Sequence, residues 1–149
     1  MPSLKSNWTK LIDQQLRLRL ESLRRDQAQL EESKGSATKS SAGDKHETGR
    51  AMMEQELTRI QVQMESARKQ LTELGQMPAN SFEKVAWGTA VRTKQGVYFI
   101  SVPLGRVNES KEPLFAISAG SPLGQLLLGK GAGDTVTFRG NEFNLLELH

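Results

Sequence analysis

The sequence predicts an α+β fold: an N-terminal antiparallel helical hairpin, or coiled coil, followed by a small antiparallel sheet domain with one short helix. Three observations predict it. Apolar residues repeat with heptad spacing in the first half, alternation and glycine turns fill the second half, and a polar break rich in Gly and Ser divides the helical part. We place the hairpin at residues 1–77 and the sheet domain at residues 78–149.

The helical half contains two seams of apolar residues. The second seam alternates spacings of four and three without a break: Met53, Leu57, Ile60, Met64, Ala67, Leu71 and Leu74. The first repeats that spacing at Leu16, Leu20, Leu23, Gln27 and Leu30, after Trp8, Leu11 and Ile12. We expect Ser6 or Asn7 to cap the first helix, and Gly75 and Pro78 to end the second.

The two seams flank the break at residues 34–43, which predicts a reversal of the chain and an antiparallel pair of helices. At the α-helical rise, each arm would extend ~40 Å. Heptads are equally typical of an oligomeric seam. A dimeric coiled-coil adaptor is therefore an alternative to a monomer with a projecting arm.

The second half contains short strands separated by turns. Residues 87–93 and 97–102 flank a glycine turn, residues 114–117 form a buried-strand candidate, and residues 135–138 and 142–148 form a second hairpin. Ser121 and Pro122 start the short helix, with Ser as the N-cap and Pro at the first helical position. These elements predict a sheet with one helix packed on it.

Composition excludes several classes of protein. The chain has no Cys and two His, so thiolate zinc sites, disulfides and a Cys nucleophile are excluded. No apolar run approaches the ~20 residues of a membrane span, so we expect no membrane partner and a cytoplasmic protein. Residues 1–77 hold 13 basic and 11 acidic residues (+2), and residues 78–149 hold 7 and 6 (+1). Such a balance does not favour autonomous DNA binding.

The reversal contains the pair of residues of most interest. Asp44 and Glu47 stand three residues apart at the start of the second helix, so both carboxylates are able to face one way. On spacing alone, helix capping explains them well, because Asp is a preferred cap and both charges favour the helix dipole. His46 between them is a weaker candidate for a metal ligand. Their place at the end of a long arm is what suggests a function.

The second half shows no catalytic set. Its carboxylates are scattered, and its glycine-rich segment at residues 129–133 lacks the spacing and the Ser or Thr of a phosphate-binding loop. We therefore interpret that segment as a turn.

The chain resembles the bacterial Gre transcript-cleavage factors, GreA and GreB. The most specific motifs are Ala116-Ile-Ser118, Ser121-Pro-Leu-Gly-Gln-Leu-Leu-Leu-Gly-Lys130 and Gly133-Asp-Thr-Val136, with Gly88-Thr-Ala-Val91 at the entry strand. At the reversal, Gly43-Asp44-Lys45-His46-Glu47 is similar to the family's Gly-Asp-Leu-Lys/Ser-Glu. With the hairpin, the similarity covers nearly the whole chain.

The resemblance implies a two-part factor that is not itself an enzyme. An FKBP-like C-terminal domain would dock on RNA polymerase, through residues such as Ser118, Ser121, Pro122, Leu123 and Gly124. The coiled coil would enter the secondary channel and bring its tip near the 3′ end of the nascent RNA. There Asp44 and Glu47 would assist a Mg²⁺ ion of the polymerase in cleaving backtracked RNA, and the factor would need no cofactor of its own.

The sequence departs from the family directly after the tip. Where the family continues Asn-Ala-Glu-Tyr, this chain has Thr48-Gly49-Arg50-Ala51. An acidic and an aromatic position are lost, and one position becomes basic. The alternative function is therefore a Gre-like secondary-channel regulator or inhibitor that does not stimulate cleavage. A third reading, a prolyl isomerase, rests only on the FKBP-like fold and would need an aromatic pocket.

Overall fold

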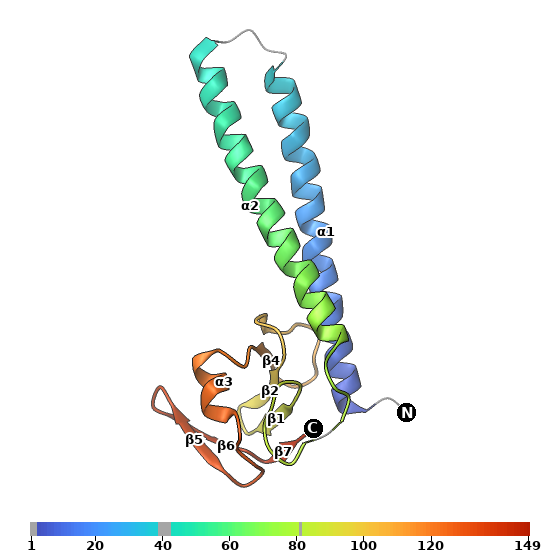
Figure 1. The fold of residues 1–149 in the computed structure, drawn as a ribbon, viewed down its shortest axis with the longest axis vertical. Coiled ribbons are helices and arrows are strands. Elements are labelled where there is room, and N and C mark those ends of the chain that lie inside the picture. Colours follow the sequence, from blue (N-terminus) through green and yellow to red (C-terminus); the bar gives the residue numbers. More distant parts are fainter. Residues whose placement is uncertain (1–2, 39–42, 81) are drawn as a thin grey trace. The chain divides into compact units, whose positions relative to one another are not determined.

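The computed structural model describes the chain except residues 1–2, 39–42 and 81, and except the side chains of residues 37–38 and 43–48. The chain forms two compact units (Figure 1). The hairpin unit is Leu16–Leu71, and the sheet unit combines Met1–Gln15 with Thr72–His149. The predicted boundary at residue 77 follows the change of secondary structure, whereas compactness groups the start of the first helix with the C-terminal half.

Helices α1 (Leu4–Thr38) and α2 (Gly43–Gly75) form the predicted antiparallel pair, side by side in Figure 1. Within the hairpin unit, the apolar seam is confirmed. Its buried cluster consists of Leu20, Leu23, Ile60, Met64 and Ala67, with Leu30 and Leu71 packed against it. The residues between seam positions are mostly exposed, which is the pattern of a two-helix coiled coil.

The first helix is longer than predicted at both ends. It begins at Leu4, because the Ser3 Oγ accepts a hydrogen bond from the Ser6 N–H at 3.1 Å and so caps the helix; the expectation of a cap at Ser6 or Asn7 is wrong. It also continues through Gly35 to Thr38, inside the segment expected to hold the reversal. The predicted end of the second helix, at Gly75, is confirmed.

The described residues of the sheet unit contain seven strands, the whole of the short helix α3, the start of α1 and the end of α2. A five-stranded sheet has the order β3-β4-β2-β1-β7, with β1 (Ala90–Thr93), β2 (Gly96–Ile100), β3 (Gly105–Arg106), β4 (Leu114–Ile117) and β7 (Glu147–Leu148). A separate two-stranded sheet pairs β5 (Thr135–Phe138) with β6 (Asn141–Asn144), and α3 is Pro122–Leu127. The predicted fold class, a hairpin followed by a mostly antiparallel sheet and a short helix, is confirmed.

Two details of the sheet differ from the expectation. Strands β2 and β4 pair in parallel, in the register Val97 to Leu114, because the intervening chain crosses over and β3 pairs on the far side of β4. The predicted strand 142–148 is divided, since β6 ends at Asn144 and the final strand β7 pairs with β1 in the other sheet. Leu145 fills the gap and is buried in the core.

The core of the sheet unit lies where the strands meet α3. Its buried members come from four strands (β1, β2, β5 and β6), from α3 and from two positions between elements: Val85, Val91, Ile100, Leu123, Leu127, Val136, Phe143 and Leu145. In the part of the chain that the structure describes, no buried side-chain nitrogen or oxygen lacks a hydrogen-bond partner. The core therefore buries its apolar side chains and pairs its buried polar groups, as a stable folded unit requires.

Candidate functional site

The tip, residues 39–48, contains the predicted acidic pair. The backbone of Asp44 and Glu47 lies in the first turns of α2, which begins at Gly43. On an α-helix, residues three apart share a face, and the N-terminal dipole stabilises carboxylates there. The side chains of Asp44, His46 and Glu47 lie outside the described residues, so their predicted roles stay predictions. An N-cap is the residue that directly precedes a helix. Because α2 begins at Gly43, Asp44 lies inside the helix and is not its N-cap.

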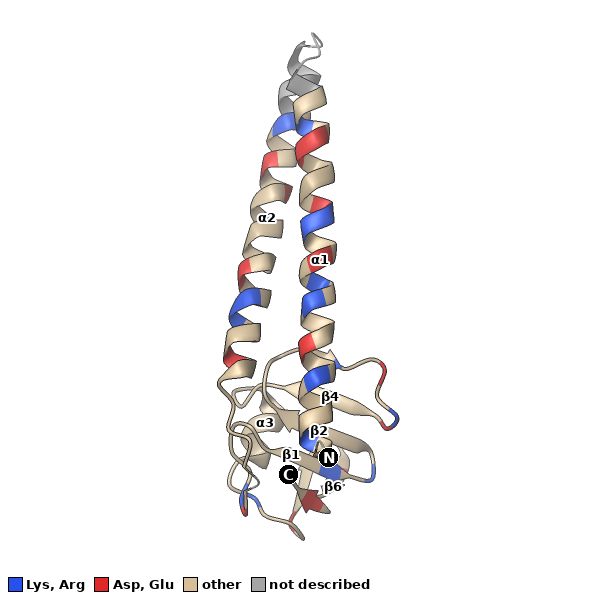
Figure 2. Ribbon diagram, turned by 90° about the vertical axis from the view of Figure 1, so that its right-hand side faces the viewer, with Lys and Arg blue, Asp and Glu red and all other residues tan. Residues whose placement is uncertain are grey.

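Just after the tip, an ion-pair cluster joins the two helices of the hairpin unit. The Glu54 Oε1 lies 3.2 Å from the Lys34 Nζ of α1 and 3.6 Å from the Arg50 Nε of α2. Arg50, the basic residue that departs from the Gre pattern, is thereby paired along its own helix at the spacing i, i+4. Figure 2 shows acidic and basic residues interspersed along the described parts of both helices in this view.

The predicted docking segment forms the start of α3. The Ser121 Oγ donates to the Ser118 carbonyl oxygen at 2.8 Å and accepts from the Gly124 N–H at 3.0 Å. This is the N-cap that the sequence predicts, with Pro122 at the first helical position. The cap fixes where the short helix begins, and so fixes which of its side chains face the solvent.

Gly124 is buried where the backbone folds closely upon itself. A Cβ atom at this position would lie 2.2 Å from the Ser118 carbonyl oxygen and 2.8 Å from the Ser121 Oγ. Leu123, its neighbour, is 9% exposed and belongs to the core. Leu123 and Gly124 therefore support α3 from within, while Pro122 lies on the surface and Ser118 and Ser121 are half-buried. Their docking role stays a prediction.

Two leucines next to this segment are exposed. Leu126 is 42% exposed and Leu128 is 38% exposed, on either side of the buried Leu127. The spacing of Leu123, Leu126 and Leu127 predicts one apolar face for the short helix, and the structure buries Leu123 and Leu127 of that face but not Leu126. The structure therefore adds Leu126 and Leu128 to Pro122 as the apolar residues that the α3 segment presents to the solvent.

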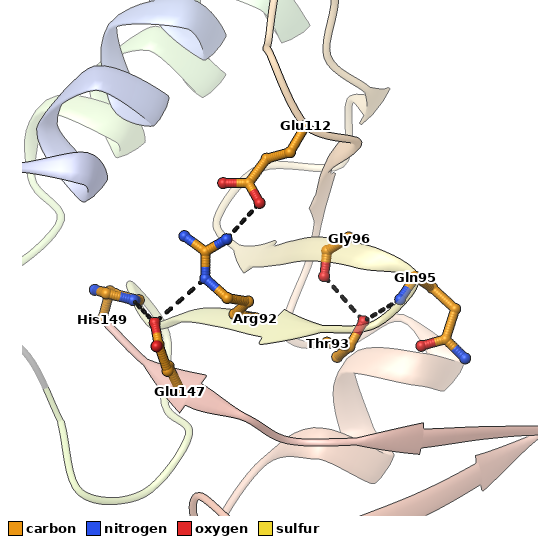
Figure 3. A network of polar contacts seen from close by, with 7 residues as sticks. All are labelled: Arg92, Thr93, Gln95, Gly96, Glu112, Glu147 and His149. Carbon is orange, nitrogen blue, oxygen red and sulfur yellow. Dashed lines mark hydrogen bonds and ion pairs between the residues drawn. The ribbon is translucent and has the colours of Figure 1, made fainter.

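A polar network at the edge of the sheet is shown in Figure 3. Arg92 of β1 pairs with Glu112 through its Nη1, and its Nε lies 3.3 Å from the Glu147 Oε2 of β7. The His149 ring nitrogen Nε2 lies 3.0 Å from the same carboxylate oxygen. The His149 hydrogen bond, followed by the charge of Arg92, lowers the pKa of Glu147 below its ordinary value.

The same network contacts the start of α1. The His149 ring meets the Trp8 ring edge-on, with centroids 5.5 Å apart, and the Arg92 guanidinium carbon lies 5.6 Å from the Trp8 centroid. Trp8 is only 4% exposed. These contacts explain why residues 1–15 belong to the sheet unit, and they are structural contacts that join the two ends of the described chain.

The aromatic residues of the sheet pack on one another. Tyr98 stacks on Phe115 with centroids 5.0 Å apart and meets Phe143 edge-on at 5.5 Å. Burial raises the pKa of Tyr98. Phe99 and Phe143 are buried in the interior. These rings contribute to packing, as expected for strand positions.

The described residues of the chain hold no group of three or more His, Cys, Asp or Glu side chains placed to bind a metal ion. None of its described helices combines the length and the apolar character needed to cross a membrane.

No protein-family model and no curated protein matches this chain. Solved structures do match it. A structure of the transcription factor Gfh1 is 22% identical, with a TM-score of 0.40, and the match covers 92% of each chain. A crystal structure of GreA factor homolog 1 (Gfh1) from Thermus thermophilus is 21% identical, with a TM-score of 0.38, and covers 92% of this chain and 94% of the other. The second description names a homologue of GreA, the family that the sequence motifs resemble.

Proposed function

We propose that this chain is a Gre-like factor that binds RNA polymerase, inserts the hairpin tip into the secondary channel and stimulates cleavage of backtracked RNA. One observation carries the proposal: Asp44 and Glu47, in a Gre-like tip motif, lie in the first turns of α2 beside the reversal of an antiparallel hairpin. The same chain carries the Ser121-capped helix of the second Gre-like motif. The protein acts as a monomer in the cytoplasm.

Asp44 and Glu47 have the chemistry of ligands that a second protein could contribute to a metal ion of the polymerase. Carboxylate oxygens are the ligands that Mg²⁺ prefers, and two of them three residues apart on one helix can reach a single ion. Asp44 and Glu47 would help to hold a Mg²⁺ ion of the polymerase, and such an ion would supply activation of water for phosphodiester hydrolysis. Asp44 and Glu47 supply oxygen ligands or orient the water near the RNA 3′ end, while the chain itself is not an enzyme and has no cofactor of its own.

The sheet unit serves the second part of the function, which is docking. Pro122, Leu126 and Leu128 are exposed apolar residues of the α3 segment, and the Ser121 cap fixes where this helix starts. Apolar anchors on a rigid element lose little conformational freedom on binding, which favours their use as an interface. We assign the polymerase-docking surface to these residues together with the exposed parts of Ser118 and Ser121.

The first test of this function is RNA cleavage in a stalled, backtracked elongation complex of the cognate polymerase. We expect this chain to accelerate the release of short 3′ fragments, and the Asp44→Ala/Glu47→Ala variant to lose that acceleration while still binding the polymerase. An equal loss of binding would make the acidic pair a docking or capping element. Binding of the unmodified chain without acceleration would instead support the alternative, a channel regulator or inhibitor.

The docking surface has its own test, which is affinity for the polymerase. Leu126→Ser is expected to weaken binding roughly tenfold, because truncating an interface anchor commonly costs more than 1 kcal/mol. The matched control is Leu146→Ser, which changes another leucine of the sheet unit that is 47% exposed. Equal effects of the two changes would show that α3 is not the docking surface.

A further inference from the structure

The apolar seam of the hairpin unit becomes thinner toward the tip. In α2, Leu57 is the last buried apolar residue in that direction among the described side chains, and beyond it Met53 is half-buried and Met52 is 65% exposed. In α1, Leu23 is buried and Leu30 only half-buried. The described turns nearest the tip therefore gain less from apolar burial than the turns around Ile60.

The same turns contain two glycines within regular helix. Gly35 of α1 and Gly49 of α2 have no atom within 4 Å of the position that a Cβ would occupy. Among the described residues, no close approach of another segment requires glycine there. Glycine in a helix interior lowers helix stability, since it loses more conformational freedom on folding than other residues. These turns are thus weak both in packing and in intrinsic helix propensity.

The ion-pair cluster of Lys34, Arg50 and Glu54 lies in this weak region. The contact between Lys34 and Glu54 crosses from α1 to α2, while the contact between Arg50 and Glu54 runs along α2. A single carboxylate thus holds one cation from each helix. Their side chains are between 30% and 52% exposed, so the pairing is accessible to salt.

We propose that Glu54 is a positioning residue for the tip: by joining Lys34 to Arg50 it holds the first turns of α2 folded against α1. For its consequence at the polymerase, this inference rests on the proposed function, because those turns carry Asp44 and Glu47. Arg50 then belongs to the support of the acidic pair, and its difference from the Gre pattern does not by itself indicate an inhibitor.

The expected effect is modest and local. Exposed ion pairs shift an equilibrium by about two- to fivefold. Local openings near helix ends occur at a small free-energy cost, so a shift of that size changes the folded fraction there without unfolding the hairpin. A structural role in the hairpin as a whole would instead alter the turns around Ile60 as well.

The direct experiment is amide hydrogen exchange on the free, full-length chain, comparing Glu54→Gln with the unmodified protein. We expect amides of residues 49–53 to exchange two- to fivefold faster in the variant, and amides of residues 60–67 to be unchanged. The matched control is Glu56→Gln, two residues away, because Glu56 pairs with Arg59 at 3.0 Å within α2. Equal exchange in Glu54→Gln and unmodified protein would overturn the proposal.

Two further measurements separate the ion pair from other effects of the substitution. Added salt should raise the exchange of residues 49–53 in the unmodified protein toward that of Glu54→Gln, because exposed charges are screened. Lys34→Arg should retain the protection, whereas Lys34→Met should lose it. Protection that is insensitive to salt and to Lys34→Met would overturn the cross-helix role of Glu54.

Cleavage by the elongation complex then tests the positioning role. If the unmodified chain stimulates cleavage, Glu54→Gln should lower that stimulation and Glu56→Gln should not. Unchanged stimulation despite faster exchange in Glu54→Gln would overturn the positioning role. If the unmodified chain fails to stimulate cleavage, the proposed cleavage function fails, and the exchange experiment alone decides whether Glu54 joins the two helices.

Discussion

The hairpin unit buries one stripe of apolar residues between two helices, whereas the sheet unit buries a cluster drawn from strands, loops and α3. The described apolar positions of the hairpin seam recur at heptad spacing, so we expect a local change to have a local effect. In the sheet unit, β1 pairs with β2 and with β7 at the far end of the sequence, so its parts depend on one another. We therefore expect the sheet unit to unfold cooperatively, and the described end of the hairpin to respond to local changes in stability.

The largest expected effect comes from crowding the sheet unit at Gly124. Gly124→Ala should lower the free energy of unfolding by about 2–3 kcal/mol, because overpacking at a site without space outweighs the better helix propensity of Ala. Urea unfolding followed by Trp fluorescence measures this effect, since Trp8 and Trp87 both belong to the sheet unit. Gly120→Ala is the control, because a Cβ there would meet no atom within 4 Å. Equal stability of the two variants would contradict the close packing around α3.

The opposite sign is expected for a glycine of the hairpin unit. Gly49→Ala should stabilise the first turns of α2 by about 0.5–1 kcal/mol, because the position is open and Ala favours helix. Slower amide exchange at residues 50–53, without a change at residues 60–67, is the measurement. A destabilised variant would mean that Gly49 has a packing role that the structure does not show.

The smallest expected effect concerns pH and the network of Arg92, Glu147 and His149. The folded-state pKa of Glu147 is lowered, first by the His149 hydrogen bond and then by Arg92. The stabilising contribution is therefore fully present above the ordinary value of 4.5 and is lost as the pH falls through the lower folded value. The stability of the sheet unit should fall less steeply below pH 4.5 in Glu147→Gln. Identical acid unfolding curves would remove Glu147 from this role.

The sequence predicted local features better than features that depend on distant segments. The seam from Leu57 to Leu74 and the Ser121 cap follow from spacing and residue type alone, and both are confirmed. The parallel pairing of β2 with β4 was missed, because register between strands joined by an irregular crossover leaves no local pattern. The division of the last strand at Leu145 and Leu146 was missed for the same reason.

The candidate site shows the same limit. Spacing predicted that Asp44 and Glu47 lie at the start of α2, and the helix indeed begins at Gly43. The Ser-Pro-Leu-Gly motif identified the segment around α3, but the motif specifies how the helix starts, and Leu123 and Gly124 are used in the interior. The exposure of Leu126 and the pairing of Arg50 with Glu54 depend on three-dimensional packing, which a single sequence does not contain.

We propose that the tip stimulates RNA cleavage and that the sheet unit binds the polymerase. The most direct test of this division is to titrate each protein into backtracked elongation complexes and to measure the cleavage rate at every concentration. We predict that Asp44→Ala/Glu47→Ala lowers the maximal rate without moving the half-saturating concentration, and that Leu126→Ser raises the half-saturating concentration without lowering the maximal rate. If both variants lowered the maximal rate and raised the half-saturating concentration together, the division of function between tip and sheet unit would be contradicted.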